Sequence, residues 1–177
     1  MARSRPRFGL LEVALLVSIG ATLLAVFIPT FARRVRTNKI LEASMLLRDM
    51  RARAASYYAT EWPQGQRCLP QRAGPTPAAP TVDAEPVDFH APGALGHETW
   101  EALGFQPARP VRYSYRYTPT DTGCELGGET RDGVVVFSAE GDLDADDVRS
   151  RFELHATPQL DGTLAPDGVL RVHRRIE

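Results

Sequence analysis

Hydrophobic residues are concentrated near the N-terminus. Residues 8–31 include 17 hydrophobic positions in 24, and Glu12 is the only charged one. An apolar run of about 20 residues is long enough to cross a bilayer as a helix. The alternative is a cleavable secretory signal beginning with the arginines of residues 1–7. The run is longer than the core of about 7–15 residues in such signals, and no small-x-small site follows it. The pattern therefore favours an uncleaved membrane anchor over 8–31.

The hydrophobic pattern becomes amphipathic after this run. No Gly or Pro occurs between Thr30 and Trp62. Apolar side chains recur there at spacings of three and four, which is typical of one buried helix face. We predict one helix from about Phe8 to Tyr58, with an amphipathic continuation over 32–62 that needs a folded domain to pack against. Its predicted buried stripe is Ala43, Leu46, Leu47, Met50, Ala54, Tyr57 and Tyr58.

The rest of the chain has a different character. Residues 63–96 hold seven of the 14 prolines and no periodic pattern, which predicts an exposed loop. Residues 97–177 are expected to form a globular β-rich domain, with turns at Asp161-Gly162 and Asp167-Gly168. The predicted fold class is α+β, with three or four antiparallel strands packed on the second half of the long helix. The expected elements are a short helix over 97–103 and strands over 111–117, 133–139, 151–156 and 169–174.

Charge divides the chain in the same place. Residues 1–62 carry ten Lys or Arg and four Asp or Glu, whereas residues 63–177 carry 11 and 18. The net charges of +6 and −7 give the total of −1. Nothing in this balance predicts a nucleic-acid partner. Basic residues flank the apolar run on both sides, in 1–7 and 33–39, so charge counting leaves its orientation open.

The N-terminal pattern resembles that of the type IV pilin and pseudopilin family. The sequence Phe8-Gly9-Leu10-Leu11-Glu12 is followed by Pro29. In the family, a Phe begins the mature chain, a Glu is fifth and a Pro is twenty-second. Counting from Phe8, Glu12 is fifth and Pro29 is twenty-second. The resemblance covers residues 8–60, and a weaker likeness to pilin-like globular domains continues over 100–105 and 112–117.

The resemblance implies a filament subunit that assembles through its N-terminal helix. In the family, the Glu carboxylate pairs with the N-terminal amine of a neighbouring subunit, and Pro29 would let the helix loosen during packing. The implied assembly residues are thus Phe8, Glu12 and Pro29. The implied partners are other pilin subunits, the inner membrane and its assembly platform. The globular domain would be extracytoplasmic, and the filament would lie at the cell surface or in the periplasm.

One residue departs from the family pattern. Prepilin peptidase cuts after a Gly, but Arg7 precedes Phe8. Cleavage and methylation at Phe8 are therefore in doubt, and either a divergent site or an uncleaved membrane form is consistent with the sequence. This favours a minor subunit over a major one. The alternatives are a pseudopilin of a secretion system and a membrane-anchored periplasmic binding domain that does not polymerise.

The two cysteines, Cys68 and Cys124, are predicted to pair, because an extracytoplasmic domain permits disulfides. The alternative is two buried thiols. The bond would tie the Pro-rich loop to the segment after the tyrosine-rich strand, and closing a loop of this length would stabilise by about 4 kcal/mol in the chain-entropy model.

An acidic segment has the ligand spacing of a calcium loop. Position six of this loop is Asp147, where Gly is usual, and a strand is expected after it. An acidic turn between two strands is the alternative. The candidate ligands, at positions 1, 3, 5, 9 and 12, are Asp142, Asp144, Asp146, Ser150 and Glu153.

No catalytic constellation stands out. The segment His97-Glu98-Thr99-Trp100-Glu101 lacks the second His of a zinc protease helix, and there is no Gly-rich phosphate loop. We predict a structural protein and not an enzyme, with no cofactor other than calcium at the acidic segment. Each histidine is expected to be a scattered surface residue; the four are His90, His97, His155 and His173.

Overall fold

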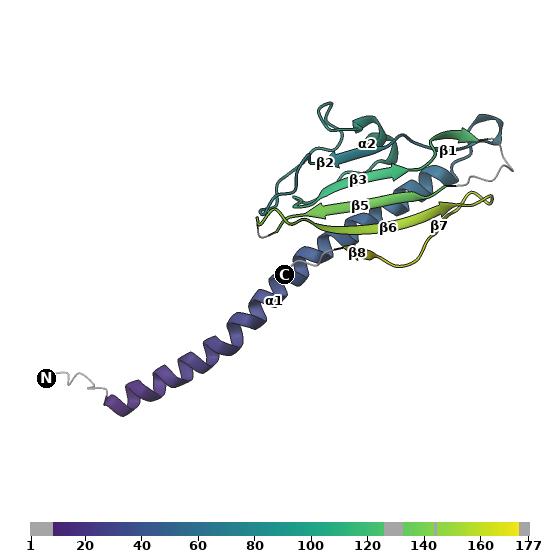
Figure 1. Ribbon diagram of the computed structural model, residues 1–177. Coiled ribbons are helices and arrows are strands. Elements are labelled where there is room, and N and C mark those ends of the chain that lie inside the picture. Colours follow the sequence, from purple (N-terminus) through teal and green to yellow (C-terminus); the bar gives the residue numbers. More distant parts are fainter. Residues whose placement is uncertain (1–8, 126–132, 144, 174–177) are drawn as a thin grey trace, which may run out of the picture. The chain divides into compact units, whose positions relative to one another are not determined.

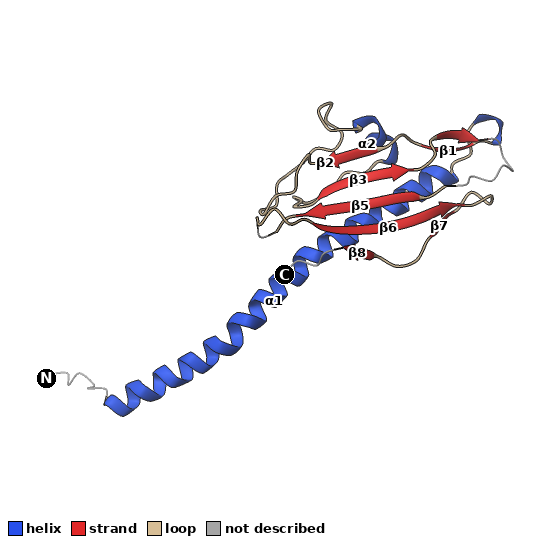
Figure 2. Ribbon diagram, viewed as in Figure 1, coloured by secondary structure: helices blue, strands red, loops and turns tan. Residues whose placement is uncertain are grey.

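The computed structural model describes residues 9–125, 133–143 and 145–173, with mixed helix and sheet (Figures 1 and 2). The chain divides into two compact units, residues 1–41 and 42–177, and each is described by itself. The elements are α1 Leu10–Ala59, a 3-10 turn Pro63–Gly65, β1 Arg67–Leu69, β2 Ala73–Thr76, α2 His97–Leu103, β3 Ser114–Pro119, β4 Gly123–Glu125, β5 Val135–Gly141, β6 Ser150–Pro158, β7 Leu164–Pro166 and β8 Arg171–His173.

The described residues of the first unit form one continuous helix after Gly9. Helix α1 begins at Leu10 and passes through Pro29 without ending, as expected from the lack of other helix breakers. Its large apolar side chains between Leu11 and Ile28 are exposed within the unit. A helix that is hydrophobic all round needs apolar surroundings, either lipid or protein.

The second unit contains the rest of α1, from Glu42 to Ala59, packed against a sheet. The buried positions recur at spacings of four and three, which gives one helix face. Most of the predicted stripe is confirmed, whereas Leu46 and Tyr57 are half-buried at its borders. The fully buried members are Ala43, Leu47, Met50, Ala54 and Tyr58.

The main sheet is antiparallel and larger than predicted. It has six strands in the order β2-β3-β5-β6-β7, with β8 also paired to β6. A separate two-stranded sheet pairs β1 with β4. The prediction of three or four strands is therefore wrong. The strands of this sheet that the sequence did not predict are β2 and β7, which have four and three residues and contain Pro, so they are too short to display a period-two pattern. The strand predicted over 169–174 is present as the short β8.

The Pro-rich segment is also more ordered than predicted. Residues 63–96 were expected to be an exposed loop, but they contain β1 and β2 and contribute Phe89 to the core. Gly74 makes the β2 pairing possible: its φ is +89°, and a Cβ there would collide with the carbonyl of Tyr115. Sequence composition gives no sign of such a close backbone approach.

The core of the second unit is aromatic. Tyr113, Tyr115 and Tyr117, which alternate along the strand predicted over 111–117, are all fully buried. Tyr115 and Tyr117 belong to β3, and Tyr113 precedes it. Phe89 packs edge-on against Trp100 and Phe105 with ring centroids about 5.5 Å apart. Helix α2 supplies Trp100 and ends where Gly104 takes a left-handed conformation.

Candidate assembly helix and charged surfaces

The first candidate site is the apolar half of α1. Leu11–Ile28 is the one candidate membrane span among the described residues. It is long and apolar enough to cross a membrane, which a signal sequence near an N-terminus would also be. Leu11, Leu16 and Phe27 are 81%, 60% and 65% exposed within the chain. Surface of this kind marks a site that lipid or another protein covers.

Glu12 lies in the first turn of α1. The backbone N–H of Gly9 donates a hydrogen bond to its Oε2, at 2.9 Å. The carbonyl of Gly9 in turn accepts from the N–H groups of Glu12 and Val13. Glu12 therefore caps the first turn of the helix. It forms no ion pair within the described residues.

For Pro29 and Phe8, the other two predicted assembly residues, the described part of the chain shows no contact that bears on assembly. Pro29 is inside α1, and the helix does not end there although proline lacks a backbone donor. Phe8 lies outside the described residues. The roles of Glu12, Pro29 and Phe8 in assembly therefore stay predictions.

In comparisons with known proteins, no protein-family model, curated protein or solved structure matches the chain.

A charged contact fastens α1 to the sheet within the second unit. The Glu42 carboxylate accepts hydrogen bonds from the Arg112 backbone N–H at 2.8 Å and from Arg112 Nη1 at 3.1 Å. The Tyr115 hydroxyl donates to the same carboxylate at 3.5 Å. Burial, followed by the nearby Glu42 charge, raises the pKa of Tyr115 well above its usual range. This phenol therefore remains a donor across physiological pH.

Sequence reasoning missed the Glu42 contact. The signal available was a single acidic residue next to the buried stripe of α1, beside Ala43. Its partner Arg112 is 70 residues away, at the start of the tyrosine-rich segment. Periodicity identifies the buried face of each element, but it does not indicate which residue of one element meets which residue of another.

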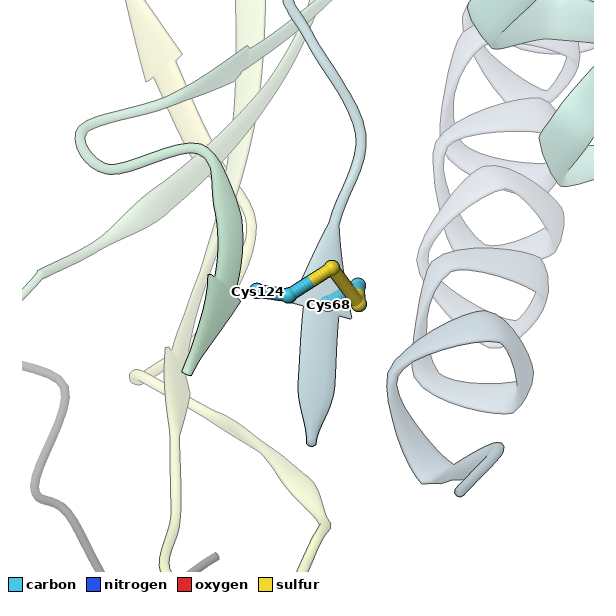
Figure 3. The surroundings of a disulfide bond; sticks show 2 residues. All are labelled: Cys68 and Cys124. Carbon is cyan, nitrogen blue, oxygen red and sulfur yellow. A yellow bond between two sulfur atoms is a disulfide. The ribbon is translucent and has the colours of Figure 1, made fainter. Parts of the chain in front are cut away.

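The predicted disulfide is present. Cys68 in β1 and Cys124 in β4 are directly paired in the register of the two-stranded sheet (Figure 3). Cys68 is buried, whereas Cys124 is exposed. The bond closes a loop with a sequence separation of 56 residues and joins the Pro-rich segment to the chain after β3, as expected.

The predicted calcium ligands do not gather into one site among the described residues. Asp144 lies outside them, and the described part of the chain contains no group of three side chains suited to a metal. Asp147 does have the left-handed conformation that position six requires, with φ of 64°. Asp146 instead accepts from the Val148 N–H, and the Ser150 hydroxyl donates to the Gly141 carbonyl. Calcium binding stays a prediction, which a thermal melt with and without chelator would test.

Glu153, the last of those candidates, belongs to a charged network on the sheet. Its Oε1 is 2.7 Å from Arg151 Nε, and its Oε2 is 3.2 Å from His155 Nε2 and 3.7 Å from His173 Nε2. Burial opposes its ionisation most strongly, but the hydrogen bond from His155 and the adjacent positive charges together lower its pKa. The prediction of scattered surface histidines is wrong for His155, which is half-buried in this network. His90 and His97 are half-buried as well, and only His173 is exposed.

Proposed function

We propose that this protein is a structural subunit of a type IV pilus-like filament, most consistent with a minor pilin. Its α1 helix would pack in a bundle with the helices of other subunits, and the second unit would form the outer part of the filament. Before assembly, the apolar run would cross the inner membrane once, with the second unit extracytoplasmic. The proposed role is assembly and not catalysis.

One observation carries the proposal. An acidic residue, Glu12, lies at the beginning of an exposed apolar helix surface, in the same register with Pro29 as in pilins. An ionised carboxylate costs at least about 2.5 kcal/mol in the hydrocarbon. In a helix bundle it would need a positive partner to offset this cost. The described residues of the chain supply no such cation, and a neighbouring subunit can.

The rest of the chain supports the proposal. The same helix continues past the apolar run to Ala59 and becomes part of a folded α+β unit. A disulfide suits an oxidising location outside the cytoplasm. Arg7 remains the departure from the pattern, since a chain that keeps it has no free amine at Phe8. The positive partner of Glu12 would then be a different group, or the carboxyl would be protonated.

Replacing Glu12 tests the proposal. We expect Glu12→Ala to lower the amount of the full-length subunit in sheared surface filaments by about tenfold or more, as losing an interaction worth about 1.4 kcal/mol would. Its amount in the membrane should be unchanged. Glu12→Gln should behave like Glu12→Ala if charge pairing matters. Leu16→Ile, which keeps the apolar surface of the same exposed run, is the matched control and should assemble nearly as wild type.

Other outcomes separate the alternatives. A pseudopilin would show the same dependence on Glu12 in a periplasmic filament, and protein secretion would fail with it. A simple anchored binding domain would be indifferent to Glu12 and absent from any filament. Normal incorporation of Glu12→Ala would contradict the proposed pairing.

A further inference from the structure

Two neighbouring hollows lie on the surface of the second unit, beside the Pro-rich segment. The first hollow has a volume of about 360 Å³ and is formed by residues 75–78, 87–88, 91 and 93–95. The second hollow, of about 350 Å³, is formed by residues 86–88 and 106–110. Val87 and Asp88 line both of them, so the two hollows adjoin.

Hydrogen bonds hold the walls of the first hollow in place. The backbone N–H of Gly74 donates to the Leu95 carbonyl at 2.8 Å. The buried Trp100 Nε1 donates to the Thr76 hydroxyl at 3.1 Å. Leu95 and Thr76 both line the hollow, so these bonds fix its walls to β2 and α2 before any ligand enters. A preformed hollow loses less conformational entropy on binding than a flexible surface does.

The walls of the first hollow are mainly apolar. Leu95, in one wall, is 61% exposed. Asp88 is the only charged residue among those that line the hollow. An apolar wall with one placed charge suits a side chain that has an apolar stem and a charged end. The apolar residues of the lining that bear on this argument are Pro75, Pro77, Ala78, Val87 and Leu95.

One oxygen of the Asp88 carboxylate is available to a ligand. Its Oδ1 accepts a hydrogen bond from the backbone N–H of His90 at 2.9 Å, which orients the carboxylate. Its Oδ2 has no hydrogen-bond or ion-pair partner among the described residues. A single free oxygen suits the compact ammonium group of lysine, whereas a guanidinium pairs best with both oxygens of a carboxylate.

The chain that forms the first hollow is acidic. Residues 73–108 include its whole lining and contain five carboxylates and no Lys or Arg, which gives a formal charge of −5. With the flanking Arg72 and Arg109 the charge is −3. This charge attracts a cation and repels an anion. The five carboxylates, all exposed, belong to Asp83, Glu85, Asp88, Glu98 and Glu101.

We propose that the first hollow binds a lysine side chain that an extended segment of another protein presents. The stem of the lysine would pack on Pro75 and Leu95, and its ammonium would meet Asp88 Oδ2. The next residues of the segment would enter the second hollow, where Arg109 disfavours another cation. Because Asp88 is exposed, binding should weaken as the salt concentration increases. This inference does not rest on the filament proposal.

A labelled peptide tests this contact on the full-length chain. The chain is placed in nanodiscs of phosphatidylcholine, a lipid without net charge, and empty nanodiscs give the background. The probe is the peptide Gly-Ser-Lys-Ser-Gly, blocked at both ends, and its binding is followed by fluorescence anisotropy. We expect saturable binding at low salt. A peptide with norleucine in place of lysine keeps the stem without the charge and should bind about fivefold more weakly, and a peptide with Glu more weakly still.

Two variants of the chain alter the first hollow, and a third is the matched control. Asp88→Asn keeps an oxygen for the His90 N–H and should weaken binding about fivefold. Ala78→Trp fills the hollow from an exposed position and should abolish saturable binding. Glu101→Gln removes the same charge from the same acidic stretch, outside the lining, and should bind within about twofold of wild type. A thermal melt checks that each variant is folded.

Several results would overturn the proposal. One is unchanged binding in both Asp88→Asn and Ala78→Trp, because the peptide would then bind elsewhere. Another is an equal loss in Glu101→Gln, because the total charge alone would then explain binding. Equal binding of the norleucine peptide, or no saturable binding of the lysine peptide by wild type, would also contradict it. Glu12→Ala should leave peptide binding unchanged, so this test and the test of filament assembly can fail separately.

Discussion

The two units of the chain differ in how far their hydrophobic side chains are buried. In residues 42–177, Trp100 and Phe137 are completely buried within the unit, whereas Leu11 and Leu16 of the first unit are exposed. Burial of apolar surface is worth about 25 cal/mol per Å² and stabilises the second unit without help from another molecule. The first unit can obtain this energy only from lipid or other helices. A mutation should therefore affect folding in one unit and assembly in the other.

The largest expected loss of stability comes from a mutation in the core of the second unit. Phe137→Ala removes a ring at the centre of β5 and should lower the free energy of unfolding by about 3–5 kcal/mol. Leu16→Ala, in the first unit, should leave it within about 0.5 kcal/mol. Denaturant unfolding of the full-length chain in detergent measures both. Equal losses for the two variants would mean that the exposed helix is part of the folded core after all.

The disulfide should give the next largest effect. Replacing both Cys68 and Cys124 by Ala should destabilise the second unit by about 4 kcal/mol in the chain-entropy model for a separation of 56 residues. A reducing agent should have the same effect on the wild type and none on the double variant. If the reductant leaves the unfolding midpoint of the wild type unchanged, the bond does not contribute to stability.

A smaller loss is expected where α1 is fastened to the sheet. Glu42→Gln leaves the donors of Arg112 and Tyr115 without their carboxylate and should cost about 1–3 kcal/mol of unfolding free energy. The control is Glu61→Gln, whose side chain is 71% exposed and should change stability by less than about 1 kcal/mol. Similar values for both would show that the buried contact is no stronger than a surface ion pair.

The smallest expected effect concerns pH. The folded protein lowers the pKa of Glu153, so its charge contributes stability above its ordinary pKa. That contribution is lost as the pH falls through the lowered value. Glu153→Gln should therefore melt below the wild type at neutral pH, with the difference shrinking on acidification. Glu98→Gln, a change at an exposed side chain of α2, is the control and should alter the melting temperature little at neutral pH. A constant gap for Glu153→Gln would contradict the network.

These differences also show how far sequence reasoning reaches. The stripe from Ala43 to Tyr58 and the short helix over 97–103 were predictable, because helical spacing and the following Gly104 are local signals. Strand β2 was not predictable from local signals. It depends on the close approach of Gly74 to the carbonyl of Tyr115, a residue 41 positions further along the chain.

The same limit applies to the charged sites. Cys68 and Cys124 could be paired because the chain has only two cysteines. Glu153 and His173 are 20 residues apart and meet only because β8 pairs with β6. Glu12 and Pro29 could be singled out from their spacing in the sequence alone, which requires no contact between them.

Cross-linking from the exposed run tests the central claim most directly. A photoreactive phenylalanine analogue is placed at Leu16 of the full-length chain in cells that assemble filaments. The account predicts adducts between this chain and other subunits that depend on Glu12 and are enriched in the filament fraction. Recovery of only uncross-linked chain or lipid adducts from that fraction would contradict it, because the apolar helix would then have no protein neighbour.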